Sequence, residues 1–330
     1  MSNLKNKKIL VTGAGGFIGS HLVEALVKLD AKVRAFLRYT SDSGIGHLSE
    51  LEPAVREDIE MYRGEIRDFD SVKKAMKDID IVFNLAALTG IPYSYQHPVE
   101  VFETNTLGIL NILSASRDMQ LKRIVHTSSS EVYGSAQYVP IDEKHPLQPQ
   151  SPYSASKIAA DSLALSFYYS FGTPVSIIRP FNAYGPRQSI RAVIPTIILQ
   201  LLKRNKISLG NLQTKRDFTF VKDTVQGFIK IAESPESIGE IINVGSSSEI
   251  SIEDLAKKIS AITGRQLHID TDKVRLRPEK SEVKRLFASN KKAKELTDWQ
   301  PNYSLDKGLG ETVEFYRRNL KDYYTEEYGV

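Results

Sequence analysis

The first 180 residues alternate between short runs of β-branched apolar residues and longer amphipathic segments. The apolar runs predict strands, and the segments whose apolar residues recur every three to four positions predict helices. This alternation indicates a parallel sheet covered by helices on both faces. The predicted strands are residues 8–12, 32–37, 59–63, 79–85, 123–127 and 175–178, and the predicted helices are residues 17–29, 71–77, 98–119 and one that starts at Pro152.

After Arg179 the alternation is lost, because prolines interrupt the chain. We expect helices over residues 195–204, 224–233, 252–263 and 305–319, with strands over residues 217–221 and 240–244. Ser251 and Ser304 stand where two of these helices need N-cap residues. The sequence therefore predicts an α/β fold: a Rossmann-type doubly wound parallel sheet over residues 1–180, followed by a smaller mixed α/β C-terminal substrate lobe over residues 181–330, whose elements can interleave.

Composition narrows the function classes. The chain has 330 residues, a net charge of +4 and no cysteine, so disulfides, thiol nucleophiles and cysteine zinc sites are excluded. Its six histidines show no ligand spacing, and we expect no metal. No basic block with interleaved aromatics and no membrane-length apolar run is present, so we expect neither nucleic acid nor membrane as a partner. A cytoplasmic protein with anionic ligands fits this composition.

Three glycines stand between the first predicted strand and the first helix. Gly13, Gly16 and Gly19 have the spacing Gly-x-x-Gly-x-x-Gly, with Phe17 and Ile18 at the start of the helix. Glycines in this position permit a tight turn, close approach of a pyrophosphate and close helix packing, and the helix N-terminus supplies amide donors. A glycine run on its own is usually only a turn, but the strand-turn-helix context favours dinucleotide binding.

The ends of the next strands bear on the choice of cofactor. No acid follows the second strand, where one would bind the adenosine ribose, and Arg38 there favours NADP over NAD. A solvated charge is the alternative for Arg38. After the third strand, Glu65 and Ile66 provide a carboxylate and an apolar neighbour for adenine. The fourth strand ends in residues that would let a nicotinamide lie close to the backbone, Leu85, Ala86 and Ala87.

Tyr153 and Lys157 lie four residues apart at the start of a predicted helix, so both side chains project from one face. A lysine beside a phenol favours the phenolate, which predicts a proton-transfer pair. Just before it, the fifth strand ends in Thr-Ser-Ser-Ser-Glu at the edge of the sheet where ligands bind. Ser129 can orient a substrate alcohol, and Glu131 is a candidate base for a carbon-bound proton. A serine-rich turn is the alternative.

These motifs, with the stretch Arg-Pro-Phe-Asn-Ala-Tyr-Gly-Pro-Arg at residues 179–187, resemble the extended short-chain dehydrogenase/reductase family acting on nucleotide sugars. Within it the chain is most similar to nucleotide-sugar 4,6-dehydratases, especially the legionaminic-acid-type branch acting on nucleotide-linked N-acetylglucosamine. The resemblance implies that Ser129, Tyr153 and Lys157 form the family triad and that Glu131 is the dehydration base.

The resemblance also implies a substrate site in the C-terminal lobe. Arg216 and Arg277 match the family's clamp on the sugar-nucleotide diphosphate, and arginine suits phosphate because its planar fork binds two oxygens. Asn182 resembles the asparagine that contacts the diphosphate, and Arg187 ends the same stretch. Pro92 belongs to a segment that resembles the loop on the sugar side. Without the family, each arginine would more often be a solvated charge.

One position leaves the reaction open. Dehydratases of dTDP-glucose carry Asp-Glu where this chain has Ser130 and Glu131, so the group that protonates the C6 leaving hydroxyl is Ser130, Glu131 or an ordered water. GDP-mannose 4,6-dehydratases and UDP-glucuronate decarboxylases share the Ser-Glu pair. A 4-epimerase would need the triad without Glu131, and a dinucleotide sensor that has lost catalysis is the alternative from another class.

We therefore expect a 4,6-dehydratase of UDP-N-acetylglucosamine or a related sugar, in cell-surface polysaccharide biosynthesis, with NAD or NADP tightly bound and recycled. A homodimer is also expected, through a four-helix interface built by the helices from Pro98 and Pro152. The apolar residues that suggest it are Leu107, Ile109, Leu110, Ile112, Leu163, Leu165 and Phe167.

Overall fold

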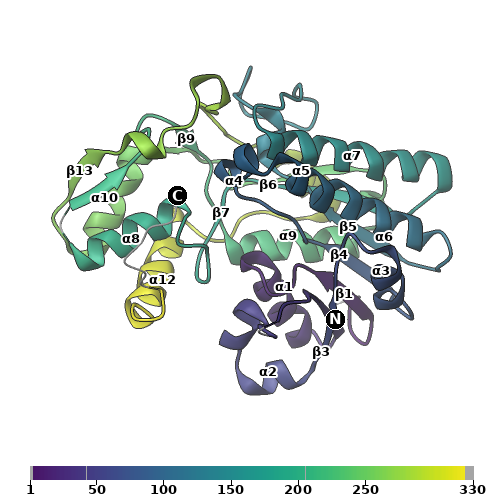
Figure 1. Cartoon of the computed structure of the whole chain (residues 1–330). Helices are drawn as coiled ribbons and strands as arrows, with labels where there is room; N and C mark the ends of the chain where they lie inside the picture. Colours follow the sequence, from purple (N-terminus) through teal and green to yellow (C-terminus); the bar gives the residue numbers. More distant parts are fainter. Residues whose placement is uncertain (1–2, 42, 205, 324–330) are drawn as a thin grey trace.

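A seven-stranded parallel sheet forms the centre of the larger lobe (Figure 1). The computed structural model describes residues 3–41, 43–204 and 206–323, so the expected limits at residues 1 and 330 lie outside it. The strand order is β11-β6-β5-β4-β1-β2-β3. The strands are β1 Lys8–Thr12, β2 Lys32–Arg38, β3 Ile59–Gly64, β4 Ile81–Asn84, β5 Arg123–Thr127, β6 Val175–Pro180 and β11 Ile241–Val244. The predicted Rossmann-type fold is confirmed.

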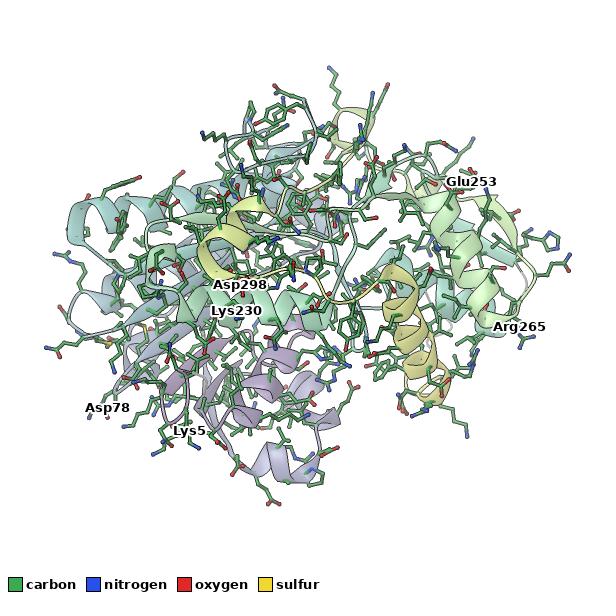
Figure 2. All side chains as sticks on the ribbon, turned by 180° about the vertical axis from the view of Figure 1, so that it is seen from behind. Lys5, Asp78, Lys230, Glu253, Arg265 and Asp298 are labelled. Carbon is green, nitrogen blue, oxygen red and sulfur yellow. The ribbon has the colours of Figure 1, made fainter. Side chains whose placement is uncertain are left out.

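Helices cover both faces of this sheet, and each face has its own apolar core. On one face, residues of the strands pack against α1, α9 and α11. Seen from behind, α9 and α11 lie across this face near the labelled Lys230 and Asp298 (Figure 2). On the other face the core lies under α3, α6 and α7. These helices are α1 Phe17–Lys28, α3 Phe69–Ala75, α6 Gly108–Ser116, α7 Pro152–Phe171, α9 Val221–Glu233 and α11 Lys291–Thr297.

Part of the chain beyond residue 180 returns to the large sheet. Strand β11 pairs with β6, with Ile242 opposite Ile178, and becomes the edge strand. Helix α9, which precedes β11, and helix α11, which follows it later in the chain, pack on the same sheet. The C-terminal half of the sequence therefore completes the layers of the larger lobe as well as forming the smaller one.

The smaller lobe packs three helices around a separate core (Figure 1, left). Ser251 accepts a hydrogen bond from the Asp254 amide and Ser304 one from the Lys307 amide, so both predicted caps are confirmed. Three short strand pairs complete the lobe and its junction. Its elements are α8 Val193–Lys203, α10 Ile252–Thr263, α12 Leu305–Arg318, β7 Ala183–Tyr184, β8 Lys206–Leu209, β9 Lys215–Arg216, β10 Thr219–Phe220, β12 Ile250–Ser251 and β13 His268–Thr271.

Some predicted elements differ from the structure. The strand expected over residues 217–221 is wrong in length, because only Thr219–Phe220 is a strand and α9 begins at Val221. The helix expected over residues 98–119 is divided by a π-helical turn, Glu103–Leu107, between α5 (Pro98–Phe102) and α6. Two short helices were not predicted from the sequence: α2 (Pro53–Glu57), which contacts α1 and β3, and α4 (Ile91–Gln96), which contacts α7.

Among the described residues, none of the helices combines the length and apolar character needed to cross a membrane. The same residues contain no cluster of three or more histidine or acidic side chains that could hold a metal ion.

Ile242→Ala tests how firmly β11 belongs to the large sheet. Ile242 is fully buried, so we expect the variant to lose about 2–5 kcal/mol of unfolding free energy. Ile269→Ala, in the half-exposed strand β13, is the matched control and should lose less. Urea denaturation would measure both variants. Equal losses in the two variants would contradict the firm attachment of β11 to the large sheet.

Candidate active site

The predicted cofactor turn lies where β1 ends and α1 begins. Gly13 has a φ of +66°, and a Cβ on Gly19 would lie 2.1 Å from the Gly13 carbonyl oxygen, so the helix packs closely on the turn. Gly16 is the N-cap, without a side-chain cap hydrogen bond, and the first turn, which begins with Phe17 and Ile18, contains no acidic residue. The positive end of the helix is therefore open to an anion, and these residues fit a dinucleotide pyrophosphate.

Three further cofactor candidates lie at the ends of β2 and β3. Arg38 is exposed at the end of β2, and its Nε lies 3.9 Å from a Glu65 carboxylate oxygen. Glu65 also accepts a hydrogen bond of 3.2 Å from Arg67, and these arginines help hold the pKa of its carboxyl below the usual value. Ile66 is buried, and its carbonyl accepts a hydrogen bond from Asn111. Arg38 and Glu65 thus form one charged group at this edge of the sheet.

The loop after β4 lies directly against the glycine turn. A Cβ on Gly13 would lie 2.8 Å from the Ala86 nitrogen. The amides of Leu85 and Ala86 both donate to Thr12 Oγ1, at 3.1 and 3.0 Å. Ala87 follows, half-buried, in the same loop. The two loops therefore lie in close contact, and the predicted approach of a nicotinamide to the backbone of Leu85, Ala86 and Ala87 stays a prediction.

Tyr153 and Lys157 project from the first turns of α7. Ser151 caps this helix with a reciprocal capping box, which fixes its start. Lys157 Nζ donates a hydrogen bond of 2.8 Å to the Thr127 carbonyl at the end of β5. The Tyr153 ring packs against Ile91 in a small apolar cluster. Ser129, which follows β5, is close enough for its hydroxyl to lower the pKa of Tyr153, so the three expected triad residues lie together.

Burial shifts both ionisable groups toward their neutral forms. It raises the pKa of Tyr153 to about 12, against a hydrogen bond from Ser129 that lowers it. It lowers the pKa of Lys157 to about 8, while the charge of Asp161 opposes this shift. The protein's own groups therefore leave the phenol protonated near neutral pH. Burial is the largest influence on the pKa of Tyr153, and the expectation that Lys157 favours the phenolate stays a prediction.

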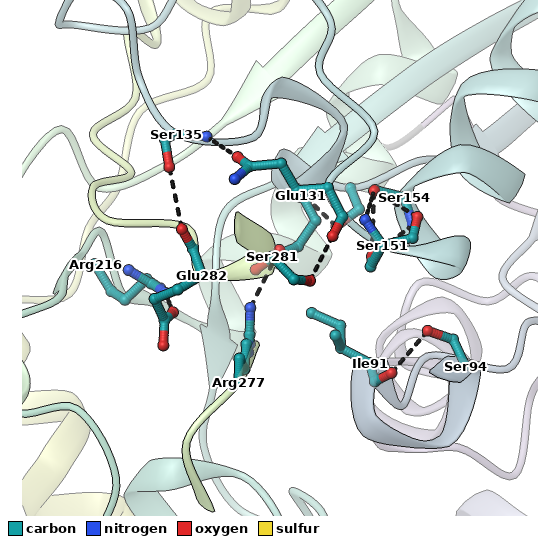
Figure 3. Close-up of polar contacts among 12 residues, drawn as sticks. Ile91, Ser94, Glu131, Ser135, Ser151, Ser154, Arg216, Arg277, Ser281 and Glu282 are labelled. Carbon is teal, nitrogen blue, oxygen red and sulfur yellow. Dashed lines mark hydrogen bonds and ion pairs between the residues drawn. The ribbon is translucent and has the colours of Figure 1, made fainter. Parts of the chain in front are cut away.

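Glu131 lies beside Arg277 of the C-terminal lobe (Figure 3). Its carboxylate lies 3.6 Å from Arg277 Nη1. Arg277 is half-buried, whereas Arg216 is buried and pairs with Glu282 at 3.4 Å; burial lowers the pKa of Arg216, and the charge of Glu131 opposes this shift. Ser130 and Glu131 open a short 3₁₀ helix after β5, and Ser130 is buried. The structure thus brings the expected base and the two expected phosphate-binding arginines together.

The sequence analysis missed the contacts that join the two lobes beside Glu131. Tyr95 OH lies 2.6 Å from Ser281 Oγ, and the Ser281 hydroxyl donates to the Gln150 carbonyl. Gln150 Nε2 donates to the Lys280 carbonyl at 2.9 Å. No local sequence signal marks these residues, because each is a single polar side chain in a loop that tertiary contacts bring to the site.

Three expected substrate residues have different surroundings. Asn182 Nδ2 donates to the Asp217 carbonyl at 3.3 Å, next to Arg216 in the chain. Pro92 is exposed near the start of α4, whose other face covers Tyr153. Arg187 pairs with Glu24 of α1 at 2.7 Å, so its guanidinium lies against the cofactor helix.

The chain is similar to several known proteins over most of its length. A family model described as GDP-mannose 4,6 dehydratase matches residues 10–312. The chain belongs to this family, within the extended short-chain dehydrogenases/reductases. An uncharacterized UDP-glucose epimerase of Bacillus subtilis is 33% identical, with 93% of this chain and 97% of that protein aligned. The dTDP-D-glucose 4,6-dehydratase of Mus musculus is 31% identical, with coverages of 97% and 92%.

A solved structure of similar shape is the UDP-glucuronic acid 4-epimerase of Bacillus cereus, in complex with UDP-glucuronic acid and NAD. The TM-score is 0.85 and the identity 30%, over 94% of this chain and 99% of that one. Dehydratases and epimerases are thus both among the relatives. The protein is an enzyme of this nucleotide-sugar group, and the family does not distinguish the two reactions.

The buried position of His21, between α1 and Pro186, predicts that the stability of the protein depends on pH. Its Nε2 bonds to the Pro186 carbonyl at 2.9 Å, and burial, with the charge of Arg187, lowers its pKa to about 4. The unfolded chain binds a proton below pH 6.5 that the folded protein resists, so stability falls between pH 6.5 and 4, by about 2 kcal/mol at pH 5.

His21→Gln keeps a donor to Pro186 and removes this titration. We expect the variant to lose about 2 kcal/mol less unfolding free energy than the wild type between pH 7 and pH 5, measured by urea denaturation. A variant with the same acid sensitivity as the wild type would contradict the assignment.

Proposed function

We propose that the protein is a nucleotide-sugar 4,6-dehydratase, with UDP-N-acetylglucosamine or a close relative as substrate. The observation that carries this proposal is the position of Glu131. Its carboxylate lies on the helical turn after β5, in the same cleft wall as the Ser129 that contacts Tyr153. A second acid-base group near the proton-transfer pair is what elimination needs beyond oxidation at C4.

Each proposed step has a residue. Tyr153 first loses its phenol proton to solvent, and the resulting phenolate, with the Lys157 ammonium nearby to stabilise it, takes the proton of the C4 hydroxyl. A bound oxidised nicotinamide would accept the C4 hydride, add a positive charge beside the phenol, and return the hydride to C6. The C4 ketone acidifies the C5 proton, which Glu131 removes. The C6 hydroxyl leaves as water, with its proton from Glu131, Ser130 or an ordered water, and C5 is reprotonated.

The C-terminal lobe supplies the substrate-binding groups. Arg216 and Arg277 are partly or fully buried cations in the cleft wall, where a diphosphate would replace the carboxylates that now face them. Asn182 adds an amide next to them, and Arg187 a cation near α1. Pro92 would lie on the sugar side, with Ser129 orienting the C4 hydroxyl.

For the cofactor we propose NAD or NADP, tightly bound because each turnover regenerates it. Arg38 would favour NADP through a 2′-phosphate, but its neighbour Glu65 also offers a carboxylate to a ribose or adenine. The related Bacillus cereus epimerase was solved with NAD. A role in cell-surface polysaccharide biosynthesis belongs to the same proposal.

A 4-epimerase is the second candidate, since the related Bacillus cereus structure carries that name and the Tyr153–Lys157 pair serves both reactions. A decarboxylase acting on a UDP-hexuronic acid would also use C4 oxidation, with loss of the C5 carboxylate in place of the C5 proton. Neither reaction requires a base at Glu131.

Glu131→Gln separates these reactions. For a dehydratase, we expect the overall rate to fall by about 10²–10⁴-fold, because a general base is lost, while oxidation at C4 continues and the 4-keto sugar accumulates. For an epimerase, activity should remain nearly intact. Product analysis by mass spectrometry and NMR, with UDP-, GDP- and dTDP-hexoses as substrates, would decide. No 4-keto-6-deoxy product from the cofactor-loaded wild type would overturn the proposal.

We also propose the homodimer, with a revised interface. Ile109 and Ile112 were wrong as interface residues, because both are buried in the core of one chain. Leu163, Leu165 and Phe167 also pack partly against that core. The apolar side chains left exposed on α5, the π-helical turn and α7 support the interface instead: Val99, Phe102, Leu107 and Tyr169.

Phe102→Glu tests this interface. Phe102 is 50% exposed in one chain, and a carboxylate there would have to be buried on association, so we expect the dimer to become a monomer. Val274→Glu, 67% exposed on the other lobe, is the control and should stay dimeric. Sedimentation or light scattering at micromolar concentration would measure both. A monomeric wild type would contradict the proposal.

A further inference from the structure

A chain of buried polar groups crosses the large sheet at the carboxyl ends of its strands. It begins at the Leu85 and Ala86 amides, which donate to Thr12 Oγ1. The Thr12 hydroxyl donates to Asn84 Oδ1 at 2.7 Å, and Asn84 Nδ2 donates to His126 Nδ1 at 3.1 Å. Because His126 Nδ1 is an acceptor, the neutral ring carries its proton on Nε2.

The chain continues into a buried ion pair. His126 Nε2 lies 3.8 Å from Asp161 Oδ1, and neither atom has a hydrogen-bond partner among the described residues. Burial lowers the pKa of His126 well below its usual value, so its ring is neutral. Asp161 Oδ2 accepts hydrogen bonds from Arg179 Nε at 3.1 Å and Nη2 at 2.8 Å, and from Ser128 Oγ at 2.8 Å. Arg179 is therefore the countercharge of this carboxylate.

One branch from the ion pair leads to the proton-transfer pair. Ser128, which donates to the carboxylate of Asp161, stands between two residues of the site. On one side, the Thr127 carbonyl accepts the 2.8 Å hydrogen bond of Lys157 Nζ. On the other, Ser129 lies close enough to Tyr153 for its hydroxyl to lower the pKa of the phenol. If Ser128 is held in place, its neighbours Thr127 and Ser129 are held as well, and with them the contacts of Lys157 and Tyr153.

The other branch leads to Glu131. Arg179 Nη1 donates to Tyr133 OH at 2.9 Å, and the Tyr133 hydroxyl donates to Asn243 Oδ1 of β11 at 2.7 Å. Tyr133 is fully buried and stands two residues after Glu131 on the same 3₁₀ turn. The ion pair is therefore connected to the turn that carries the proposed base.

We infer that Asp161 and Arg179 are positioning residues that hold the two halves of the active site relative to each other. The Ser128 branch serves proton and hydride transfer at C4, and the Tyr133 branch serves proton removal at C5 by Glu131. The inference rests on the proposed dehydratase function. Asp161, Arg179, Ser128 and Tyr133 have no proposed contact with the substrate, so their effects are expected on the rates of separate steps.

Two conservative variants test the branches separately. The cofactor-loaded enzyme is mixed with the nucleotide sugar that the wild type turns over. Formation of reduced nicotinamide, followed by its absorbance, reports C4 oxidation, and loss of deuterium from a 5-deuterated sugar reports proton removal. We expect Ser128→Ala to slow C4 oxidation about tenfold, the effect of one lost charge-assisted hydrogen bond. Tyr133→Phe should slow C5 proton removal about tenfold and leave C4 oxidation within about twofold.

If the two branches only stabilised the fold, Ser128→Ala and Tyr133→Phe would not slow different steps. KM should stay within about twofold in both variants, because the expected phosphate-binding residues are unchanged. Asp223→Asn is the matched control: Asp223 is a buried carboxylate of α9 that accepts hydrogen bonds from the Asn302 and Tyr303 amides, away from both branches. It should change neither step.

Amide hydrogen exchange provides a readout apart from activity. We expect Asp161→Asn to accelerate exchange over residues 127–134, and Asp223→Asn to leave that segment unchanged. If Asp161→Asn fails to fold, the two branch variants still decide. Equal slowing of both steps by both variants, or slowing of neither, would overturn the inference. An epimerised product would overturn the dehydratase proposal alone, and Ser128→Ala would still have to slow C4 oxidation while Tyr133→Phe does not.

Discussion

The parallel direction of seven strands is the constraint on which the site depends. All carboxyl ends of a parallel sheet lie at one edge, so the segments that follow the strands meet there whatever their separation in the chain. The glycine turn follows β1, the loop from Leu85 follows β4, and the serines with Glu131 follow β5. Helix α7 then carries Tyr153 back to the same edge. The strand topology by itself therefore brings the cofactor and proton-transfer candidates to one edge of the sheet, without the help of side-chain contacts.

The smaller lobe adds cations to this edge and balances them with carboxylates. Arg277 faces Glu131, and Arg216 faces Glu282. A buried arginine without a partner would be strongly destabilising, so these pairs make it possible to keep phosphate-binding groups in a cleft wall. Because Glu131 pairs with Arg277, a bound diphosphate would compete with this proposed base for the arginine.

Much of this arrangement could be predicted from the sequence, because it depends on local signals. The glycine spacing marked the turn, the apolar runs marked the strands, and the four-residue spacing of Tyr153 and Lys157 placed both on one helix face. Asp161 continues that spacing by four more residues and could have been found. The loop around Ser281 and the return of β11 depend on tertiary contacts that no local pattern encodes. The high pKa of Tyr153 likewise follows from burial, which spacing does not reveal.

The central proposal is that hydride and protons move between C4, C5 and C6 of a single sugar at this site. The most direct test is turnover of a nucleotide sugar deuterated at C4, mixed with unlabelled substrate, and analysis of the product by NMR and mass spectrometry. The account predicts deuterium at C6 of a 4-keto-6-deoxy sugar, with no exchange of label between molecules. Deuterium that returns to C4 of an epimer would contradict it.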